Sequence, residues 1–234
     1  MVERHRVPVD GEAVAAVHHS AGSDEWLVFC HGFVSDKSGS YEERCRRAVE
    51  AGYDAVRFDF RGCGESDGAF VDQTLSSRVA DLRAVLGYFD PPSVVLFGSS
   101  FGAKTAFHAA PGDDRVAALA GRAPVTYNRA FADARAAVAA EGAYRYDADH
   151  VIDRRFFEDF DRYSFADVGA ALDVPVALFH GAADESVPLV DSLDAAGDLD
   201  VDVTLQTFRG EGHRFSRAAE ARMRTQLFDW LARL

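Results

Sequence analysis

SVVLFGSSFGA, residues 93–103, leads from an apolar segment into a glycine-rich turn. Residues 93–99 are mostly apolar without alternation, which is typical of a strand buried on both faces of a parallel sheet. Gly98 and Gly102 flank Ser100 in a G-x-S-x-G pentapeptide. Between a strand and a helix, this motif predicts a turn so tight that side chains at both glycines would collide with backbone. Ser100 would then expose its hydroxyl above the sheet, although a serine in such a turn can also be a simple helix cap.

Similar apolar segments recur along the chain, each followed by a turn and a stretch with helical periodicity. The expected strands are residues 2–9, 12–19, 26–31, 54–60, 93–99, 116–121, 174–180 and 201–208. The expected helices cover about 41–51, 75–89, 100–110 and the end of the chain, where Met223, Leu227, Trp230, Leu231 and Leu234 form one stripe. Asp10-Gly11 suits a hairpin turn, so the first two strands should be antiparallel. This alternation of expected strands and helices predicts an α/β fold with a mostly parallel sheet of about eight strands flanked by helices.

Residues 124–172 differ in character, being rich in Arg, Asp, Tyr and Phe and without a strong strand signal. A long excursion of this kind inside an α/β domain is usually a lid or cap. We therefore expect a single domain over residues 1–234 with a cap inserted at approximately 124–172. Its aromatic side chains could line an apolar pocket, but we expect most of them to pack the cap onto the domain. They are Tyr127, Phe131, Tyr144, Tyr146, Phe156, Phe157, Phe160, Tyr163 and Phe165.

Polar residues follow three of the expected strands. Ser100 follows the strand 93–99, Asp184 lies in HGAADESVP after the strand at 174–180, and His213 lies in GEGHRF after the last strand. Ligands bind at the carboxyl ends of parallel strands, and the order nucleophile, acid, base is the order of a serine triad on this kind of sheet. We expect Ser100 to attack, His213 to carry the proton and Asp184 to orient His213.

Other residues compete for two of these roles. Glu185 and Asp191 are alternative acids close to Asp184 in the sequence. His180 and His108 are alternative bases, but His180 ends a strand, where we expect it to pack, and His108 falls within a helix.

An oxyanion hole for this chemistry needs two backbone N–H groups. The residue after the nucleophile, Phe101, supplies the first, and Phe33 in the loop after the strand 26–31 is the simplest second donor. Gly32 would let the loop approach a substrate closely, and His31 is expected to brace the loop by hydrogen bonding. The loop lacks the HGGG run of lipases and esterases, which disfavours that subclass.

Three blocks carry a resemblance to a known family: HGFVSDKSG (31–39), RFDFRGCGESDG (57–68) and FGSSFGA (97–103). They resemble the α/β-hydrolases, in particular the cinnamoyl and feruloyl esterases and the palmitoyl-protein thioesterase and acyl-glucuronide hydrolase group. The resemblance covers almost the whole chain outside the cap. It implies an α/β-hydrolase fold and hydrolysis of a small-molecule acyl ester or thioester through a covalent acyl-enzyme, with no cofactor.

The residues carried over from the family are Ser100, Asp184, His213 and the backbone amides of Phe33 and Phe101. The cinnamoyl esterases tend to have His before the nucleophile and Gln-Gly after it, whereas this chain has Ser99 and Phe101-Gly102. The blocks therefore lean towards the thioesterase group.

The second block also contains Asp59, Arg61 and Asp67, which we expect to hold a loop rather than to touch substrate.

The function expected from these motifs is that of a serine hydrolase acting on carboxylic esters or thioesters. An acyl-protein thioesterase, a lactonase or a peptidase on the same triad is the alternative, and a binding protein that has lost its chemistry is a further one. A serine at the elbow argues against haloalkane dehalogenases, which place aspartate there.

The charge of the chain restricts its partners. Asp plus Glu number 38 against 25 Lys plus Arg, a formal charge of −13, which repels phosphate backbones and anionic membrane surfaces. We expect no nucleic-acid partner. Lys37 and Lys104 are the only lysines, a composition similar to proteins of salt-in halophiles, or alternatively to an acidic protein from a high-GC organism. Cap arginines such as Arg129, Arg135, Arg154 and Arg155 could offset the negative charge locally.

Cys30, Cys45 and Cys63 are odd in number and lack C-x-x-C spacing, so we expect free thiols and neither a metal site nor a disulfide framework. The N-terminal residues carry no apolar run, and no segment approaches the length of a membrane span. A cytoplasmic protein is the expectation.

Overall fold

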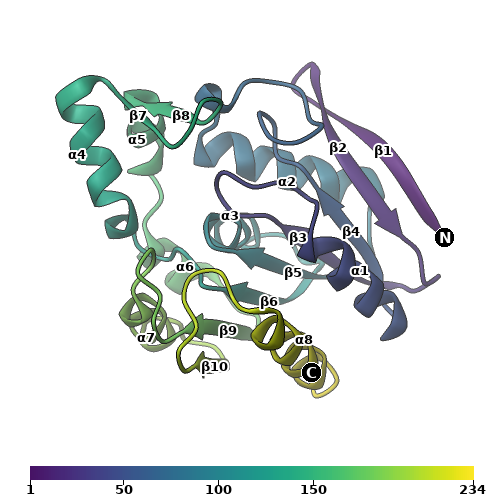
Figure 1. Cartoon of the computed structure of the whole chain (residues 1–234). Helices are drawn as coiled ribbons and strands as arrows, with labels where there is room; N and C mark the ends of the chain where they lie inside the picture. The colour runs from purple at the N-terminus through teal and green to yellow at the C-terminus, as the bar shows by residue number, and fades with distance from the viewer.

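The computed structural model describes all residues, 1–234, and its centre is an eight-stranded sheet with the order β1-β2-β4-β3-β5-β6-β9-β10 (Figure 1). The strands are β1 (Val2–Val9), β2 (Glu12–His19), β3 (Glu25–Cys30), β4 (Asp54–Phe58), β5 (Ser93–Ser99), β6 (Val116–Arg122), β9 (Val176–Gly181) and β10 (Val203–Phe208). β2 runs antiparallel to both of its neighbours, and all other neighbours are parallel. The predicted mostly parallel sheet with an antiparallel hairpin at its edge is therefore confirmed.

Three predicted strand ends are wrong by two residues, one of them the start of the last strand, which was expected at residue 201 and lies at Val203. The strand expected over 54–60 ends at Phe58, and the next residue, Asp59, instead accepts hydrogen bonds from the main-chain N–H groups of Lys37 and Glu65. The strand expected from residue 174 begins at Val176, because Pro175 has no N–H to give to a ladder.

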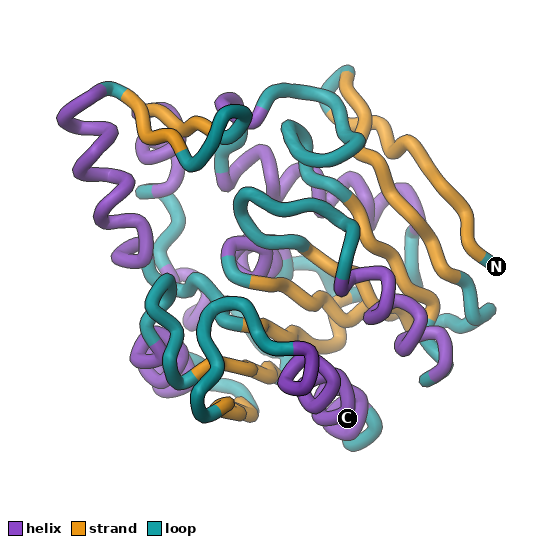
Figure 2. The backbone as a smooth tube through the Cα atoms, viewed as in Figure 1, coloured by secondary structure: helices purple, strands orange, loops and turns teal.

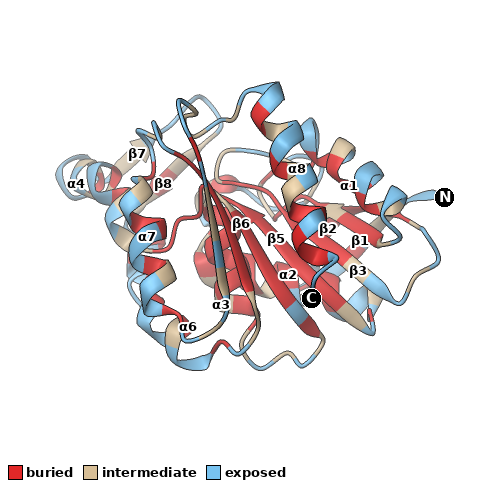
Figure 3. Cartoon of the chain, turned by 90° about the horizontal axis from the view of Figure 1, so that it is seen from below, coloured by how far each residue is buried: buried red, intermediate tan, exposed pale blue.

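Helices cover both faces of the sheet. One face carries α1 (Ser40–Glu50) and α8 (Arg217–Leu231), and the other carries α2 (Leu75–Phe89), α3 (Phe101–Ala109) and α7 (Leu189–Asp198). Alternate residues of β3 enter the two cores, with Leu27 and Phe29 facing α1 and α8 and with Val28 and Cys30 on the opposite side. Figure 3 shows the central strands as buried.

The last helix is shorter than predicted. α8 ends at Leu231, and Leu234 lies beyond it with 61% of its surface exposed, so its place in the apolar stripe is wrong. Met223, Leu227, Trp230 and Leu231 are buried as expected.

The segment between β6 and β9 contains η2 (Asn128–Phe131), α4 (Ala132–Glu141), β7 (Ala143–Arg145), β8 (Val151–Asp153), α5 (Arg154–Phe160) and α6 (Phe165–Ala171). β7 and β8 pair antiparallel in a separate two-stranded sheet. In Figures 1 and 2, α4, β7 and β8 stand together at one side of the molecule, away from both termini. We call residues 124–172 the insert; that it acts as a cap stays a prediction.

Aromatic side chains join the insert to the body. The Phe33 ring lies 4.9 to 5.5 Å from the rings of Phe70, Phe101, Phe131, Tyr146 and Phe156. The five phenylalanines of the insert are buried, which confirms the expected packing role for them: Phe131, Phe156, Phe157, Phe160 and Phe165.

All three cysteines are buried and free, as predicted. No helix combines the length and the apolar composition needed to cross a bilayer.

Candidate active site

Ser100 occupies a sharp turn between β5 and α3. Its backbone has φ 53° and ψ −119°, in the left-handed region that residues with a side chain rarely adopt. A Cβ at Gly98 would lie 2.2 Å from Ala103 Cα, and one at Gly102 would lie 2.3 Å from the carbonyl oxygen of Cys30. Both glycines are thus required by close backbone contacts, as the sequence predicts.

The structure brings Ser100, His213 and Asp184 together from the ends of three strands. His213 Nε2 lies 3.0 Å from Ser100 Oγ, and His213 Nδ1 lies 2.8 Å from Asp184 Oδ2. Because Asp184 can only accept at Oδ2 when ionised, this arrangement favours the tautomer with the proton on Nδ1 and a lone pair on Nε2 facing the serine hydroxyl.

The carboxylate of Asp184 is fully buried yet well bonded. Oδ1 accepts from the N–H groups of Ser186 and Val187, each at 2.9 Å, and His180 Nε2 lies 3.3 Å from Oδ2. Burial by itself would raise the pKa of Asp184, but the hydrogen bonds from His180, His213 and Val187 outweigh it and hold that pKa well below its usual range. Asp184 is therefore ionised beside His213.

The alternative acids and bases named from the sequence do not take the places of Asp184 and His213. Asp191 is buried against Arg129, 2.6 Å from its Nε, and Glu185 is exposed. His180 is buried behind Asp184 with its Nδ1 2.7 Å from Ser192 Oγ, which confirms its expected packing role. Its contact with Asp184 is a feature that the sequence analysis missed.

His108 sits in α3 against the Tyr163 ring, where burial, followed by the charge of Lys104, lowers its pKa to about 3.

The loop after β3 passes close to Ser100. Gly32 lies so near that a Cβ there would be 3.4 Å from Ser99 O and 3.5 Å from Ser100 Cβ. His31 braces this loop as expected: Nδ1 donates to Gly32 O at 2.8 Å, and Nε2 accepts from Phe60 N at 3.0 Å.

The two amides expected to form the oxyanion hole are free to donate. Phe33 N donates to no backbone carbonyl of the protein. Phe101 is the first residue of α3, so its N–H has no acceptor within the helix.

A comparison with known families agrees with the fold. Residues 27–227, most of the chain, match the model described as the alpha/beta hydrolase family. The chain belongs to that family. The predicted α/β-hydrolase fold is confirmed.

Several relatives of this α/β-hydrolase are known. The mitochondrial palmitoyl-protein thioesterase ABHD10 of Homo sapiens is 25% identical over 228 residues, which cover 89% of this chain and 73% of the relative. A putative hydrolase from Agrobacterium vitis S4 superposes with a TM-score of 0.85 at 27% identity, covering 97% of this chain and 98% of that one. Est1E from Butyrivibrio proteoclasticus, solved with ferulic acid, gives a TM-score of 0.85 over 98% of both chains; at 19% identity this likeness concerns the fold alone.

A groove of about 940 Å³ opens beside Ser100 and His213 in this hydrolase. Its other walls come from the loop at residues 32–41 and from the segment that follows His213, and most of its lining is polar. Arg129, Arg135 and Arg155 of the insert each pair with an aspartate, and none of the three lines this groove. The arginines that do line the groove are Arg122, Arg214, Arg217 and Arg224.

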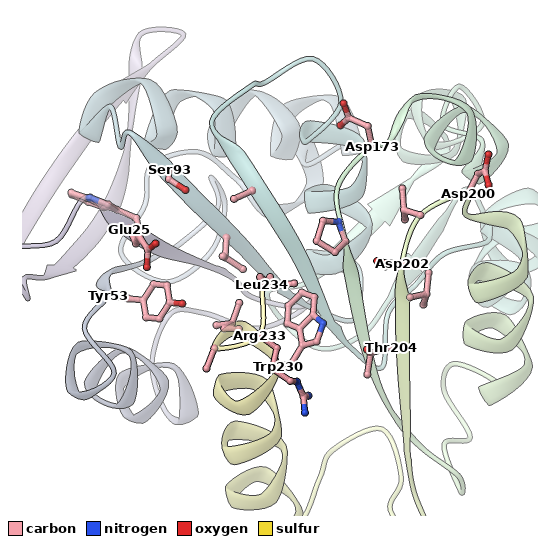
Figure 4. Close-up of a pocket in the computed structure, with 18 residues that line it drawn as sticks. Glu25, Tyr53, Ser93, Asp173, Asp200, Asp202, Thr204, Trp230, Arg233 and Leu234 are labelled. Carbon is pink, nitrogen blue, oxygen red and sulfur yellow. The ribbon is translucent and has the colours of Figure 1, made fainter.

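A larger cavity, about 1180 Å³, lies at the opposite ends of the strands. Figure 4 shows Glu25 and Ser93 at the amino ends of β3 and β5, with Trp230 from α8 across from them. Neither Ser100 nor His213 lines it. Since ligands of such sheets bind at the carboxyl ends, we assign the candidate site to the smaller groove.

The second sequence block has the structural role expected for it. Asp59 holds Lys37 through both Lys37 N (2.6 Å) and Nζ (2.5 Å), and Arg61 binds buried Asp81 at 2.6 Å. Asp67 accepts from Ala13 N at 2.9 Å.

One group of three side chains has metal-ligating atoms within 4.8 Å of one another, namely Glu3, His5 and His18. It lies on β1 and β2 at the edge of the sheet, away from Ser100, and His18 Nε2 is engaged by Asp54 at 2.8 Å.

Proposed function

We propose that this α/β-hydrolase cleaves carboxylic esters or thioesters through an acyl-enzyme on Ser100. The observation that carries the proposal is the continuous set of contacts from Ser100 Oγ to His213 Nε2 at 3.0 Å and from His213 Nδ1 to Asp184 Oδ2 at 2.8 Å. The relative named above, a palmitoyl-protein thioesterase, supports the same reaction class.

The reaction then has two halves. His213 Nε2 takes the proton of Ser100 as Oγ attacks the acyl carbon, and the N–H groups of Phe33 and Phe101 stabilise the resulting oxyanion. The intermediate collapses, the bond to the alcohol or thiol breaks, and His213 returns the proton to that leaving group. In the second half, water gives a proton to His213 as it attacks the acyl carbon; the bond to Ser100 Oγ then breaks, His213 returns the proton to Oγ, and the acid is released.

The surroundings of Ser100 favour a short acyl group. Most of the residues that line the groove beside it are polar, and Phe33, which also lines it, is packed against Phe131 and Phe156 of the insert. A long acyl chain would have to separate these rings, which lie 5.3 to 5.5 Å apart.

The test is a series of p-nitrophenyl esters and matched acyl thioesters from acetyl to palmitoyl. We expect hydrolysis by the wild type that is fastest for short chains and is abolished in Ser100→Ala. A wild type no faster than Ser100→Ala on every substrate would favour the alternative of a binding protein.

A further inference from the structure

A network of one buried and two partly buried charged side chains connects the loop of Ser100 with the loop of His213. It consists of Arg44 from α1, Glu220 from α8 and Arg122 from the end of β6. None of these positions was singled out by the sequence, since Arg44 and Glu220 lie 176 residues apart.

One end of this network lies beside the nucleophile. Arg44 Nη1 donates to Ser99 Oγ at 3.1 Å, and Ser99 directly precedes Ser100. The Arg44 side chain is 1% exposed and stacks over the rings of Tyr41 and Phe97, with its guanidinium carbon 4.7 and 4.9 Å from the ring centroids. Its position is therefore fixed on several sides.

The other end of the network contacts the main chain of the catalytic base, His213. Arg122 Nη1 donates to the main-chain carbonyl of His213 at 2.6 Å. Residues 212–215 lie outside any helix or strand, and this is the only hydrogen bond that their main chain makes. Arg122 is thus the single polar anchor for the backbone that carries the His213 imidazole.

Glu220 links the two arginines. It accepts from Arg44 Nη2 at 2.7 and 3.0 Å, and its Oε1 lies 3.6 Å from Arg122 Nε. The guanidinium groups of Arg44 and Arg122 both lie beside Glu220, where they repel one another and have lost most of their contact with water. The carboxylate between them is therefore needed to keep both in place.

We propose that Arg44, Glu220 and Arg122 are positioning residues that hold His213 at hydrogen-bond distance from Ser100. The proposal rests on the proposed function. The two end contacts of the network fix the backbone next to the nucleophile and the backbone of the base. Misplacement of a catalytic group by about 1 Å can cost about 100-fold in rate.

The test compares Arg122→Ala, Arg122→Lys and Glu220→Gln with the wild type. Two readouts are needed: kcat and KM on a short acyl ester, and the rate constant for labelling Ser100 by a small neutral fluorophosphonate. We expect Arg122→Ala to lower kcat and the labelling rate together by about 10- to 100-fold with little change in KM. Arg122→Lys should recover part of the loss, because an ammonium can still donate to the carbonyl.

Glu220→Gln is nearly isosteric with the wild type, so it still tests the network if Arg122→Ala does not fold. It should lower the same two rates, because Arg122 and Arg44 would then face each other without a counter-charge.

Arg115→Ala is the matched control. Arg115 also donates to a main-chain carbonyl, Leu86 O at 3.0 Å, and pairs with Asp113 and Asp90, but it lies outside the groove. Its loss should lower the melting temperature and leave kcat and the labelling rate unchanged.

The outcomes separate the alternatives. If Arg122→Ala and Glu220→Gln are folded and label at the wild-type rate, the positioning role is wrong while the proposed function stands. If Arg122→Ala raises KM with kcat and labelling unchanged, Arg122 contacts substrate instead, and the proposal is again overturned. If the wild type itself is not labelled at Ser100, the proposed function and this inference both fail.

Discussion

Asp184 illustrates how single side chains define the site. Its buried carboxylate accepts four contacts, two from backbone N–H groups and one each from His213 and His180. The backbone N–H groups on Oδ1 fix the orientation of the carboxylate, so that Oδ2 accepts from His213 Nδ1. A neutral amide at this position could not hold the same tautomer of His213.

Asp184→Asn is therefore expected to lower kcat by about 1,000- to 10,000-fold with a small change in KM, because His213 would lose the tautomer that accepts the serine proton. Steady-state kinetics on a short ester measures this. Glu185→Gln, a neighbouring exposed acid, is the control and should retain wild-type kcat. A similar loss in both variants would contradict the role assigned to Asp184.

The sequence could predict these residues because each lies next to an apolar strand in a fixed chain order. Ser100, Asp184 and His213 were found in this way. Arg122 and Glu220 could not be found, because arginine and glutamate are common surface residues and only the folded chain shows that they meet.

At the level of elements, α3 packs its first turn directly on the loop after β3. A Cβ at Gly102 would lie 2.3 Å from Cys30 O and 2.4 Å from His31 O, and both are backbone atoms that cannot move aside cheaply. The turn that presents Ser100 depends on this contact.

We expect Gly102→Ala to lower the free energy of unfolding by about 2–4 kcal/mol. Urea unfolding followed by circular dichroism gives the value. Gly197→Ala in α7 is the matched control, since nothing lies within 4 Å of its added Cβ, and it should be neutral or stabilising. Equal destabilisation by both substitutions would show that the close contact is not the cause.

Lys104 in α3 is buried under the insert. Its side chain donates to Thr126 O at 3.0 Å and lies 5.0 Å from the Phe160 ring centroid, and burial lowers its pKa to about 7. The unfolded chain keeps the ordinary value near 10.5, so between these two pH values the unfolded state binds more protons. The destabilisation by Lys104 is thus complete below pH 7 and disappears as the pH rises towards 10.5.

Lys104→Met should accordingly stabilise the protein near pH 7, by about 1–3 kcal/mol, through removal of a buried charge. The gain should shrink when unfolding is measured at pH 9. A gain that is the same at both pH values would contradict the titration of Lys104.

Element prediction failed mainly where local patterns are weak. β7 and β8 have only three residues each and are paired with one another, too short for a periodic signal. α7 follows Pro188 and is absent from the helices expected from the sequence.

Across the whole molecule, acid stability depends on histidines that are buried without charge. Burial, followed by the charge of Arg78, lowers the pKa of His31 to about 3, and the pKa of His108 is also lowered to about 3. In the unfolded chain both take up protons near pH 6.5. The unfolded state therefore binds more protons below that pH, and stability falls as the pH falls.

Between pH 6.5 and 5, above the range where most carboxylates titrate, the free energy of unfolding should fall by up to about 1.4 kcal/mol per pH unit for each histidine. Urea unfolding at several pH values measures the slope. His108→Gln should reduce it, and a flat profile from pH 6.5 to 5 would contradict the burial of neutral histidines.

In the folded protein, the charges that make up the formal charge of −13 are partly paired with one another. Aspartates of the insert and of neighbouring segments pair with Arg129, Arg135 and Arg155, whereas Arg214 and Arg217 at the groove make no ion pair. That the composition reflects a salty cytoplasm stays a prediction, as does the cytoplasmic location, and far-ultraviolet circular dichroism in low and high salt tests the first of them.

The central claim is that Ser100 is a nucleophile activated by His213. Intact mass spectrometry after exposure to a fluorophosphonate, followed by peptide mapping, tests it most directly. We expect one adduct per wild-type chain, located on Ser100, with none in Ser100→Ala and strongly slowed labelling in His213→Ala. A folded wild type without an adduct, or with the adduct on another residue, would contradict it.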